Sequence, residues 1–341
     1  MRVISATAIC DLMGDLMNRR EFIALLGSAA AWPLTARAQG RGEKTRRLGI
    51  LQPGAPPEPL VEALQQRLRE LGYVQGTNVD FEYRWALGKL DRLTDLAKEL
   101  VSSNVDLITT LSTPAALAAL NATKSIPIVF TAVGDPVGAR VVPNLAQPGG
   151  NITGISLLAT ELSAKRLELL REIVPNVSRL AMLWNDTNPS MVLRAQETQH
   201  AATTLGVVIQ SVGVHIPIDL DAAFVAIEHS QPDALLTLVD PFTREHRKRI
   251  VDFAAQRRLP AIYEAREFVE SGGLVSYGPS LAATQRRAAE YIDKIFKGAK
   301  PADLPVEQPA KFEMLIDMKT AKTLGLTIPQ ATLLRADEVI E

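Results

Sequence analysis

The sequence predicts an α/β protein of two lobes, each built around a parallel β-sheet. Residues 104–136 carry the pattern most clearly, because apolar runs at 105–111 and 126–133 flank a helical segment rich in Ala and Leu. Strands that are apolar throughout are typical of parallel sheets covered by helices on both faces. The same alternation of strand and helix recurs along the chain, and its 341 residues exceed one ordinary compact domain.

The first lobe is expected to comprise residues 46–156, completed by a return of the chain at about 279–306. Pro114 fits the first position of a helix, with Thr113 as its N-cap, and Gly72 ends an earlier helix. Strands are expected at 47–52, 79–85, 105–111, 126–133 and 152–156, and helices at 61–71, at 90–101 and from 114 onward.

The second lobe is expected at about 157–278 and 307–341. The chain would cross between the lobes near residues 156, 278 and 306. Strands are expected at 180–184, 207–214, 234–239, 260–263, 272–278 and 312–316, and helices at 161–174, 190–205, from 219 and at 244–258; a further helix, at 281–297, falls in the return of the chain to the first lobe.

Residues 1–38 have the features of an export signal rather than of a folded element. Arg19 and Arg20 precede a short apolar run at 24–32, and small residues around Ala38 would suit a signal peptidase. The paired arginines resemble a twin-arginine signal. The alternative, a membrane anchor that is retained, is disfavoured because the apolar run is too short to span a bilayer comfortably. The sequence therefore predicts a periplasmic protein.

Composition and cysteine content exclude several classes of function. Translation could begin at Met17, and the single cysteine, Cys10, precedes that residue, so the processed protein would carry no thiol or disulfide. A net charge of -1 gives no indication of a nucleic-acid partner. Neither a glycine-rich phosphate loop nor histidines at metal-binding spacing occur, so we expect no catalytic residue, metal or cofactor, and a protein that is not an enzyme.

Two aspartates follow the ends of apolar strands and precede proline, at Asp135 and Asp240. Each could cap a helix or turn, or could present a carboxylate to the ammonium or hydroxyl group of a ligand, since open α/β sheets bind ligands at these strand ends. Thr113 is similarly ambiguous, because the free N–H groups beside a helix cap can also bind a carboxylate. A small zwitterion or polar acid would satisfy both kinds of site.

Aromatic and charged side chains follow two later strands. Tyr263 and Tyr277 could stack on a ligand or pack in the core. Glu264 and Arg266 are expected to form a surface ion pair, the commonest fate of such neighbours.

Taken together, several of these segments resemble one family, the tryptophan/tyrosine-type substrate-binding proteins of ABC transporters. The likeness covers nearly all of the mature chain. It is carried by Glu82-Tyr83-Arg84-Trp85-Ala86, Thr113-Pro114-Ala115, Gly134-Asp135-Pro136, Gln147-Pro148-Gly149-Gly150-Asn151, Ala261-Ile262-Tyr263-Glu264 and Gly272-Gly273-Leu274-Val275-Ser276-Tyr277-Gly278.

The resemblance implies a type I periplasmic-binding fold, with two Rossmann-like lobes, three crossing strands and a ligand enclosed between the lobes. It also implies a role as the periplasmic component of an ABC importer, capturing a small polar ligand such as an amino acid or organic acid for a permease and ATPase. The alternatives are an exported sensor that signals to a receptor, or an exported α/β enzyme. We expect a monomer, with the ligand bound by Pro53, Thr113, Pro114, Asp135, Asn185, Asp240, Tyr263 and Tyr277.

Overall fold

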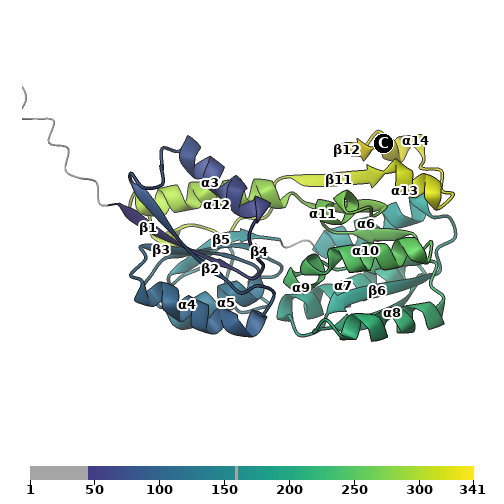
Figure 1. The fold of residues 1–341 in the computed structure, drawn as a ribbon, viewed down its shortest axis with the longest axis horizontal. Helices are drawn as coiled ribbons and strands as arrows, with labels where there is room; N and C mark the ends of the chain where they lie inside the picture. The colour runs from purple at the N-terminus through teal and green to yellow at the C-terminus, as the bar shows by residue number, and fades with distance from the viewer. Residues whose placement is uncertain (1–44, 158–159) are drawn as a thin grey trace, which may run out of the picture. The chain divides into compact units, whose positions relative to one another are not determined.

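The computed structural model describes residues 45–157 and 160–341. These residues form two α/β lobes, each with its own β-sheet and with helices on both faces of that sheet (Figure 1). The predicted fold class is therefore confirmed. The predicted export signal and Cys10 lie outside the described residues.

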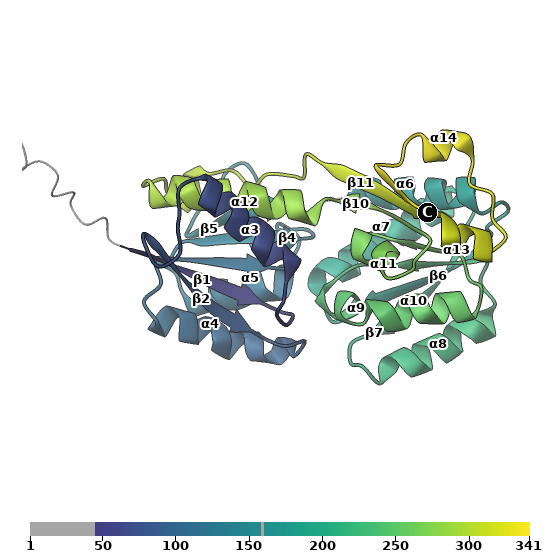
Figure 2. The same cartoon turned by 45° about the horizontal axis from the view of Figure 1, so that its top comes forward.

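The N-terminal lobe contains a five-stranded, wholly parallel sheet in the order β2-β1-β3-β4-β5. Its strands are β1 (Arg46–Gln52), β2 (Val79–Trp85), β3 (Leu107–Leu111), β4 (Ile128–Val133) and β5 (Ile152–Ser156). Helices α3 (Pro59–Glu70) and α12 (Leu281–Phe296) lie side by side on one face, and α4 (Leu93–Ser102) and α5 (Thr113–Ala122) cover the other (Figure 2). Alternate strand residues divide between the two cores: Leu48 and Ile50 pack toward α3 and α12, whereas Leu51 packs toward α4 and α5.

The C-terminal lobe contains a seven-stranded sheet in the order β12-β11-β10-β9-β8-β6-β7. Its strands are β6 (Arg179–Asn185), β7 (Val208–Val214), β8 (Ala234–Thr237), β9 (Ala261–Tyr263), β10 (Val275–Pro279), β11 (Phe312–Asp317) and β12 (Glu338–Ile340). The helices are α6 (Thr160–Ile173), α7 (Pro189–Thr204), α8 (Asp219–Ser230), α9 (Pro241–Glu245), α10 (Arg247–Gln256), α11 (Arg266–Glu270), α13 (Met318–Thr323) and α14 (Gln330–Leu333).

Two passages of chain between the lobes are joined by backbone hydrogen bonds. After α12 and the short helix η3 (Pro301–Asp303), the chain returns toward β11 past the end of β5. There the Ser156 N–H donates to the Glu307 carbonyl at 2.8 Å, and the Glu307 N–H donates to the Gly154 carbonyl at 3.1 Å. The segment around Glu307 is therefore held against the N-terminal sheet.

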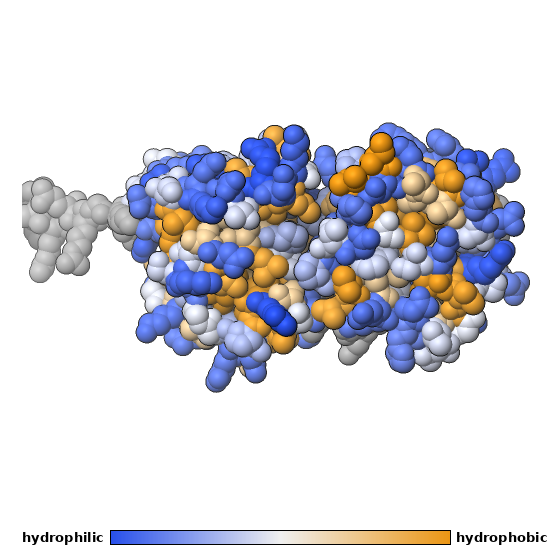
Figure 3. Space-filling model, turned by 90° about the horizontal axis from the view of Figure 1, so that it is seen from below, coloured by the Kyte–Doolittle hydropathy of each residue, from blue (hydrophilic) through white to orange (hydrophobic). Residues whose placement is uncertain are grey.

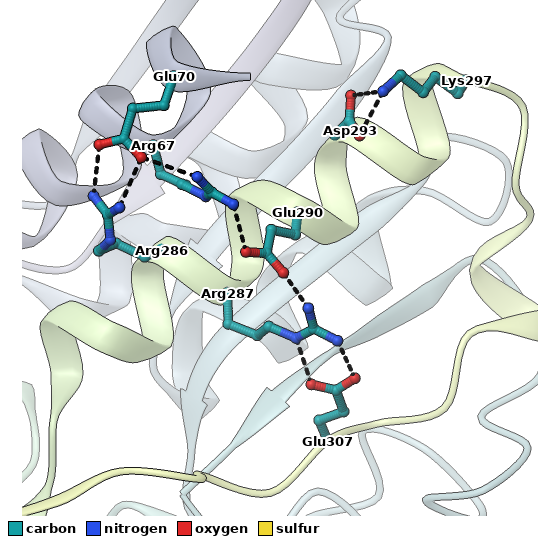
Figure 4. Close-up of polar contacts among 8 residues, drawn as sticks. All are labelled: Arg67, Glu70, Arg286, Arg287, Glu290, Asp293, Lys297 and Glu307. Atoms are coloured by element: carbon teal, nitrogen blue, oxygen red, sulfur yellow. Dashed lines mark hydrogen bonds and ion pairs between the residues drawn. The ribbon is translucent and has the colours of Figure 1, made fainter.

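A row of alternating Arg and Glu side chains ties the same segment to two helices (Figure 4). Arg287 on α12 makes a two-point contact with Glu307, with distances of 2.6 and 2.7 Å. The row also links α12 to α3 and comprises Arg286, Glu70, Arg67, Glu290, Arg287 and Glu307. Water screens each pair because all of these side chains are partly exposed, so the row positions the helices more than it stabilises them.

The structure departs from the sequence-based expectations at a few places. Helix α5 begins at Thr113 and its N-cap is Ser112, one residue earlier than expected. The expected helix at 244–258 is divided into α9 and α10, which meet at His246. One strand pair, β10 with β11, is antiparallel, and β12 was not predicted because a three-residue edge strand leaves little periodicity to recognise.

The surface shown in Figure 3 carries apolar side chains in small groups separated by polar and charged ones. Among the helices of residues 45–157 and 160–341, none has the length and apolar character needed to cross a membrane.

Candidate ligand-binding site

A cavity of about 60 Å³, partly open to solvent, lies where the carboxyl ends of strands from the two lobes meet. Small-molecule sites usually enclose about 300–1,000 Å³, so the place of this cavity at the strand ends, rather than its size, marks it as a candidate site. The N-terminal lobe and the segment after β5 contribute Pro53, Leu111, Ser112, Ala132 and Leu157; the C-terminal lobe contributes Arg194, Val239, Asp240, Pro241, Arg244, Glu264 and Ala265; the segment after β10 contributes Pro279 and Leu281.

Two strained backbone positions lie in the N-terminal wall of this cavity. Ser112 has a φ of 90°, and Ala132, in an irregular stretch of β4, has a φ of 55°. Such left-handed conformations cost non-glycine residues about 1–3 kcal/mol each and cluster at ligand sites. The Ser112 hydroxyl is buried and has no hydrogen-bond partner within the described part of the chain. It lies at the positive end of the α5 dipole.

Asp240 places a carboxylate in the opposite wall. Its Oδ1 accepts a hydrogen bond from the Thr243 N–H at 3.0 Å and forms a capping box at the start of α9. Its Oδ2 accepts from Asn185 Nδ2 at 2.6 Å and, more weakly, from Asn188 Nδ2 at 3.4 Å. Burial raises the pKa of Asp240, although these hydrogen bonds oppose the shift. A cationic ligand group would stabilise this desolvated carboxylate.

A buried cluster of two arginines and one glutamate lies beside Asp240. Arg166 Nη1 is 2.7 Å from Glu264 Oε1, and Arg194 contacts the same oxygen. Burial lowers the pKa of Arg166 to about 10, opposed by the nearby Glu264 carboxylate. Burial alone would raise the pKa of Glu264, but Arg166 and Arg194 outweigh it and hold this pKa below its ordinary value. Two cations share one anion, and Arg194 presents the surplus positive charge to the cavity.

Contacts across the cleft bring Arg194 close to the N-terminal lobe. Thr113 Oγ1 and Ser190 Oγ, from opposite lobes, are 2.7 Å apart. A Cβ atom added to Gly134 would lie 3.1 Å from the Ser190 Cβ and 3.4 Å from the Arg194 Cδ, so the absence of a side chain permits this approach. The positive end of α5 and the Arg194 side chain consequently border one cavity from opposite sides.

The sequence-predicted binding residues divide into two groups in the structure. Pro53 and Asp240 line the cavity, and Asn185 contacts it through Asp240. Thr113 bonds to Ser190 across the cleft, and Pro114 follows it in the first turn of α5.

The remaining three predicted residues, like Thr113, Pro114 and Asn185, are not part of the cavity lining, and their contacts lie elsewhere. Asp135 accepts hydrogen bonds from the N–H groups of Val137 and Gly138, at 3.0 and 2.8 Å, and so closes its own turn. Tyr263 is fully buried and stacks on Phe268. The main-chain carbonyl of Tyr277 accepts from Arg166 Nε at 2.7 Å. Their roles in binding stay predictions.

Four charged or polar residues of the site were not identified from the sequence: Ser112, Arg194, Arg244 and Glu264. The expectation of a surface pair between Glu264 and Arg266 was wrong, because Arg266 pairs with Glu270 and Glu338 while Glu264 is buried with the two arginines. The position of Glu264 directly after β9 was a usable signal. The sequence around Arg194 contains no such signal, since its partner Glu264 lies on another element. Within residues 45–157 and 160–341, no group of three or more His, Cys, Asp or Glu side chains is arranged to hold a metal ion.

Comparison with known proteins identifies the family. The sequence model of the family described as ABC transporter substrate binding protein matches residues 58–340. The chain belongs to this family. A tyrosine-binding protein from Clostridioides difficile (strain R20291) is 27% identical to this substrate-binding protein over 287 residues, which cover 83% of this chain and 82% of the relative.

Solved structures share the same fold over most of the chain. A conserved domain protein from Vibrio cholerae has 31% identity and a TM-score of 0.82, covering 87% of this chain and 100% of its own. An ABC domain from Streptococcus pneumonia in complex with L-Trp has 27% identity and a TM-score of 0.81, with the same coverage. The ligand-free, open form of a substrate-binding protein from Clostridium difficile has 25% identity and a TM-score of 0.64, covering 86% of this chain and 99% of its own. These similarities confirm the type I periplasmic-binding fold.

Proposed function

We propose that this substrate-binding protein captures a free α-amino acid with an aromatic side chain and delivers it to an ABC permease and ATPase. The observation that carries the proposal is the arrangement of opposite charges around one cavity. The α5 N-terminus, the Ser112 hydroxyl and Arg194 favour an anion, and Asp240 favours a cation. A zwitterionic amino acid carries both groups on adjacent atoms.

The carboxylate of the ligand would lie between α5 and Arg194. The first N–H groups of a helix have no partner within the helix and bind anions well. An arginine that shares its own counterion adds a charged hydrogen bond, which is stronger than a neutral one in a dry cleft. The buried Ser112 hydroxyl would gain the partner that it lacks in the protein.

The ammonium group would pair with Asp240, and the side chain would contact the apolar part of the wall. Leu111, Leu157, Val239, Pro279 and Leu281 supply this apolar surface. An aromatic side chain fits the names of two relatives, a tyrosine-binding protein and a domain in complex with L-Trp. We infer an aromatic amino acid from these two observations together.

Binding is proposed to close the two lobes over the ligand. The higher TM-score to the L-Trp complex than to the ligand-free, open relative supports this, at similar coverage of the chain. The Thr113–Ser190 contact joins the lobes directly and would break on opening. Hinge closure around a ligand is common in two-lobed binding proteins.

Export to the periplasm by the twin-arginine route, with cleavage near Ala38, completes the proposal. It rests on Arg19, Arg20 and the apolar run that follows them. The Arg19→Lys, Arg20→Lys double variant should stay in the cytoplasm, as measured by cell fractionation. Periplasmic protein whose intact mass includes the apolar run would disprove cleavage.

Isothermal titration calorimetry of the purified protein tests the ligand assignment. We expect L-tryptophan or L-tyrosine to bind with a Kd of about 10 μM or less, corresponding to roughly 7 kcal/mol. Tryptamine lacks the carboxylate and 3-(indol-3-yl)propionate lacks the ammonium group, so each should bind at least about tenfold more weakly, a loss of 1.4 kcal/mol. Equal binding of all three compounds would refute the zwitterion assignment.

Two further measurements separate the alternative functions. Uptake of the labelled amino acid should depend on the protein in intact cells, whereas a sensor would change gene expression without affecting uptake. Mass spectrometry of the ligand after incubation should return it unchanged, whereas an enzyme would convert it.

A further inference from the structure

A second pocket adjoins the ligand cavity, and Arg244 lines both spaces. This outer pocket encloses about 350 Å³ and is again partly open to solvent. The two spaces share three lining residues, Pro53, Pro241 and Arg244. Of these, only Arg244 has a long side chain that can move without moving the backbone.

Two carboxylates hold Arg244 in this position. Its Nη1 and Nη2 donate to the two oxygens of Glu58, at 3.1 and 2.8 Å. Its Nε donates to Glu267 Oε1 at 3.1 Å. The three side chains are only 17%, 10% and 19% exposed, in the order Arg244, Glu58, Glu267. Two-point arginine–carboxylate contacts of this kind fix orientation as well as distance.

The two carboxylates belong to different lobes. Glu58 is the N-cap of α3 in the N-terminal lobe, where its side chain also accepts from the Leu60 N–H. Glu267 lies on α11 in the C-terminal lobe, as does Arg244 on α9. Separation of the lobes would therefore release Arg244 from Glu58 but leave it bound to Glu267.

The position of Arg244 relates directly to one end of a bound amino acid. Asp240, the proposed partner of the ammonium group, caps the same short helix that carries Arg244. A residue attached to the amino group of the ligand would lengthen it by about 3.5 Å. Such an extension would have to pass the Arg244 side chain to reach the outer pocket.

We propose that Arg244, held by Glu58 and Glu267, is the residue that limits ligand length and excludes peptides extended at their amino end. This inference rests on the proposed binding of free aromatic amino acids. While Glu58 and Glu267 hold Arg244 in the closed state, a free amino acid does not need to pass this side chain, whereas a molecule extended at its amino end does.

Calorimetric titration of the purified protein tests this with four probes: L-tryptophan, glycyl-L-tryptophan, L-tyrosine and glycyl-L-tyrosine. The wild type should bind the free amino acid at least about 100-fold more tightly than the matching dipeptide. In Arg244→Ala this ratio should fall to about tenfold or less, because the inner and outer spaces become continuous. Arg244→Lys, which keeps a charged side chain, should give an intermediate ratio.

Two controls separate a gate from a general loosening of the site. Arg247→Ala enlarges only the outer pocket, so its ratio should equal that of the wild type. L-Tryptophyl-glycine is extended at the carboxyl end, away from Arg244, and should be rejected by the wild type and by Arg244→Ala alike. Should Arg244→Ala fail to fold, Glu58→Gln breaks the two-point contact and should lower the ratio in the same direction.

The outcomes distinguish the inference from the function on which it rests. A wild type that binds free amino acids, together with an unchanged ratio in both Arg244→Ala and Glu58→Gln, overturns the gate and leaves the proposed function intact. Equal binding of glycyl-L-tryptophan and L-tryptophan by the wild type would likewise overturn the gate and leave the proposed function intact. A wild type that binds none of the probes overturns the proposed function, and the gate with it.

Discussion

Transferring the negative charge from Asp240 to its hydrogen-bond partner Asn185 would separate the role of Asp240 in ligand binding from its role in folding. In Asp240→Asn the new amide can still cap α9 through its oxygen, because asparagine and aspartate are equally good N-caps. Its nitrogen, however, would face the donor Nδ2 of Asn185, now 2.6 Å from the carboxylate. The side-chain amide of Asn185 cannot flip without cost, since its Oδ1 already accepts hydrogen bonds from the Thr187 N–H and hydroxyl groups.

This clash of donors sets the cost to the empty protein. A buried donor without an acceptor costs about 1–3 kcal/mol. For a chain of this size, each kcal/mol lowers the melting temperature by roughly 1.5–2 °C. Asp240→Ala would lose the cap as well, so an unchanged melting temperature is not expected for either variant.

The double variant Asp240→Asn, Asn185→Asp is the matched control. It restores a carboxylate–amide pair and keeps an acceptor for Thr187, but the charge now lies on a residue that does not line the cavity. Scanning fluorimetry should show that most of the lost melting temperature returns. Affinity for L-tryptophan should stay weaker by about 2–5 kcal/mol, or at least roughly 30-fold, because the ammonium group has lost its buried partner.

Binding by the double variant at wild-type affinity would refute the assignment of Asp240 to the ammonium group. Asp240 would then be a helix cap alone. The analogue 3-(indol-3-yl)propionate provides an internal reference, because it has no ammonium group and should bind the wild type and the double variant with similar affinity.

Three further changes test other parts of the site. Glu264→Gln leaves Arg166 and Arg194 buried without a counterion and should lower the free energy of unfolding in urea at pH 7 by about 3–5 kcal/mol. The pKa of Glu264 in the folded protein lies below its ordinary value of about 4.3. The stabilisation by the ionised carboxylate is therefore fully present above about pH 4.3 and is lost as the pH falls through the folded pKa. The difference in free energy of unfolding between wild type and variant should shrink accordingly at low pH. Ser112→Gly should relieve the strained φ of 90° and raise the melting temperature, yet weaken L-tryptophan binding by about 1 kcal/mol through loss of the hydroxyl; equal affinity would exclude a contact with the ligand. Gly134→Ala places a methyl group 3.1 Å from the Ser190 Cβ and should hinder closure, so small-angle scattering should show a smaller decrease in radius on ligand addition than in the wild type, with the melting temperature of the empty protein unchanged.

The strands and most helices could be predicted because each depends on a local pattern. Apolar runs such as Leu107–Leu111 and Ile128–Val133 indicate buried parallel strands whatever their neighbours are. The start of α5 was misplaced by one residue because Ser112 and Thr113 are both good caps by composition. In the structure the helix already begins at Thr113, so Ser112, with a φ of 90° and no capping bond from its side chain, is the N-cap.

The charged cluster could not be predicted, because its members come from three separate elements. Arg166, Arg194 and Glu264 lie on α6, on α7 and directly after β9. Pairs on one helix can be recognised by a spacing of three or four residues, but no spacing relates partners that the tertiary fold brings together. The chemistry of each charged side chain can be read from the sequence, but the partner with which that side chain is buried cannot.

Asp135 and Asp240 show why the same local motif can have two roles. Each follows a strand and precedes a proline, yet the chain after Asp135 folds back at once, so that Asp135 bonds to Val137 and Gly138. After Asp240 the chain enters α9, and Asn185 from the neighbouring strand β6 donates to Oδ2. Both carboxylates satisfy local N–H groups, as caps do, but the second is also anchored from outside its own segment and borders the cavity. A cap becomes a candidate ligand group when a neighbouring strand holds it at the carboxyl edge of the sheet, and that neighbour is specified by sheet order rather than by the Asp-Pro motif.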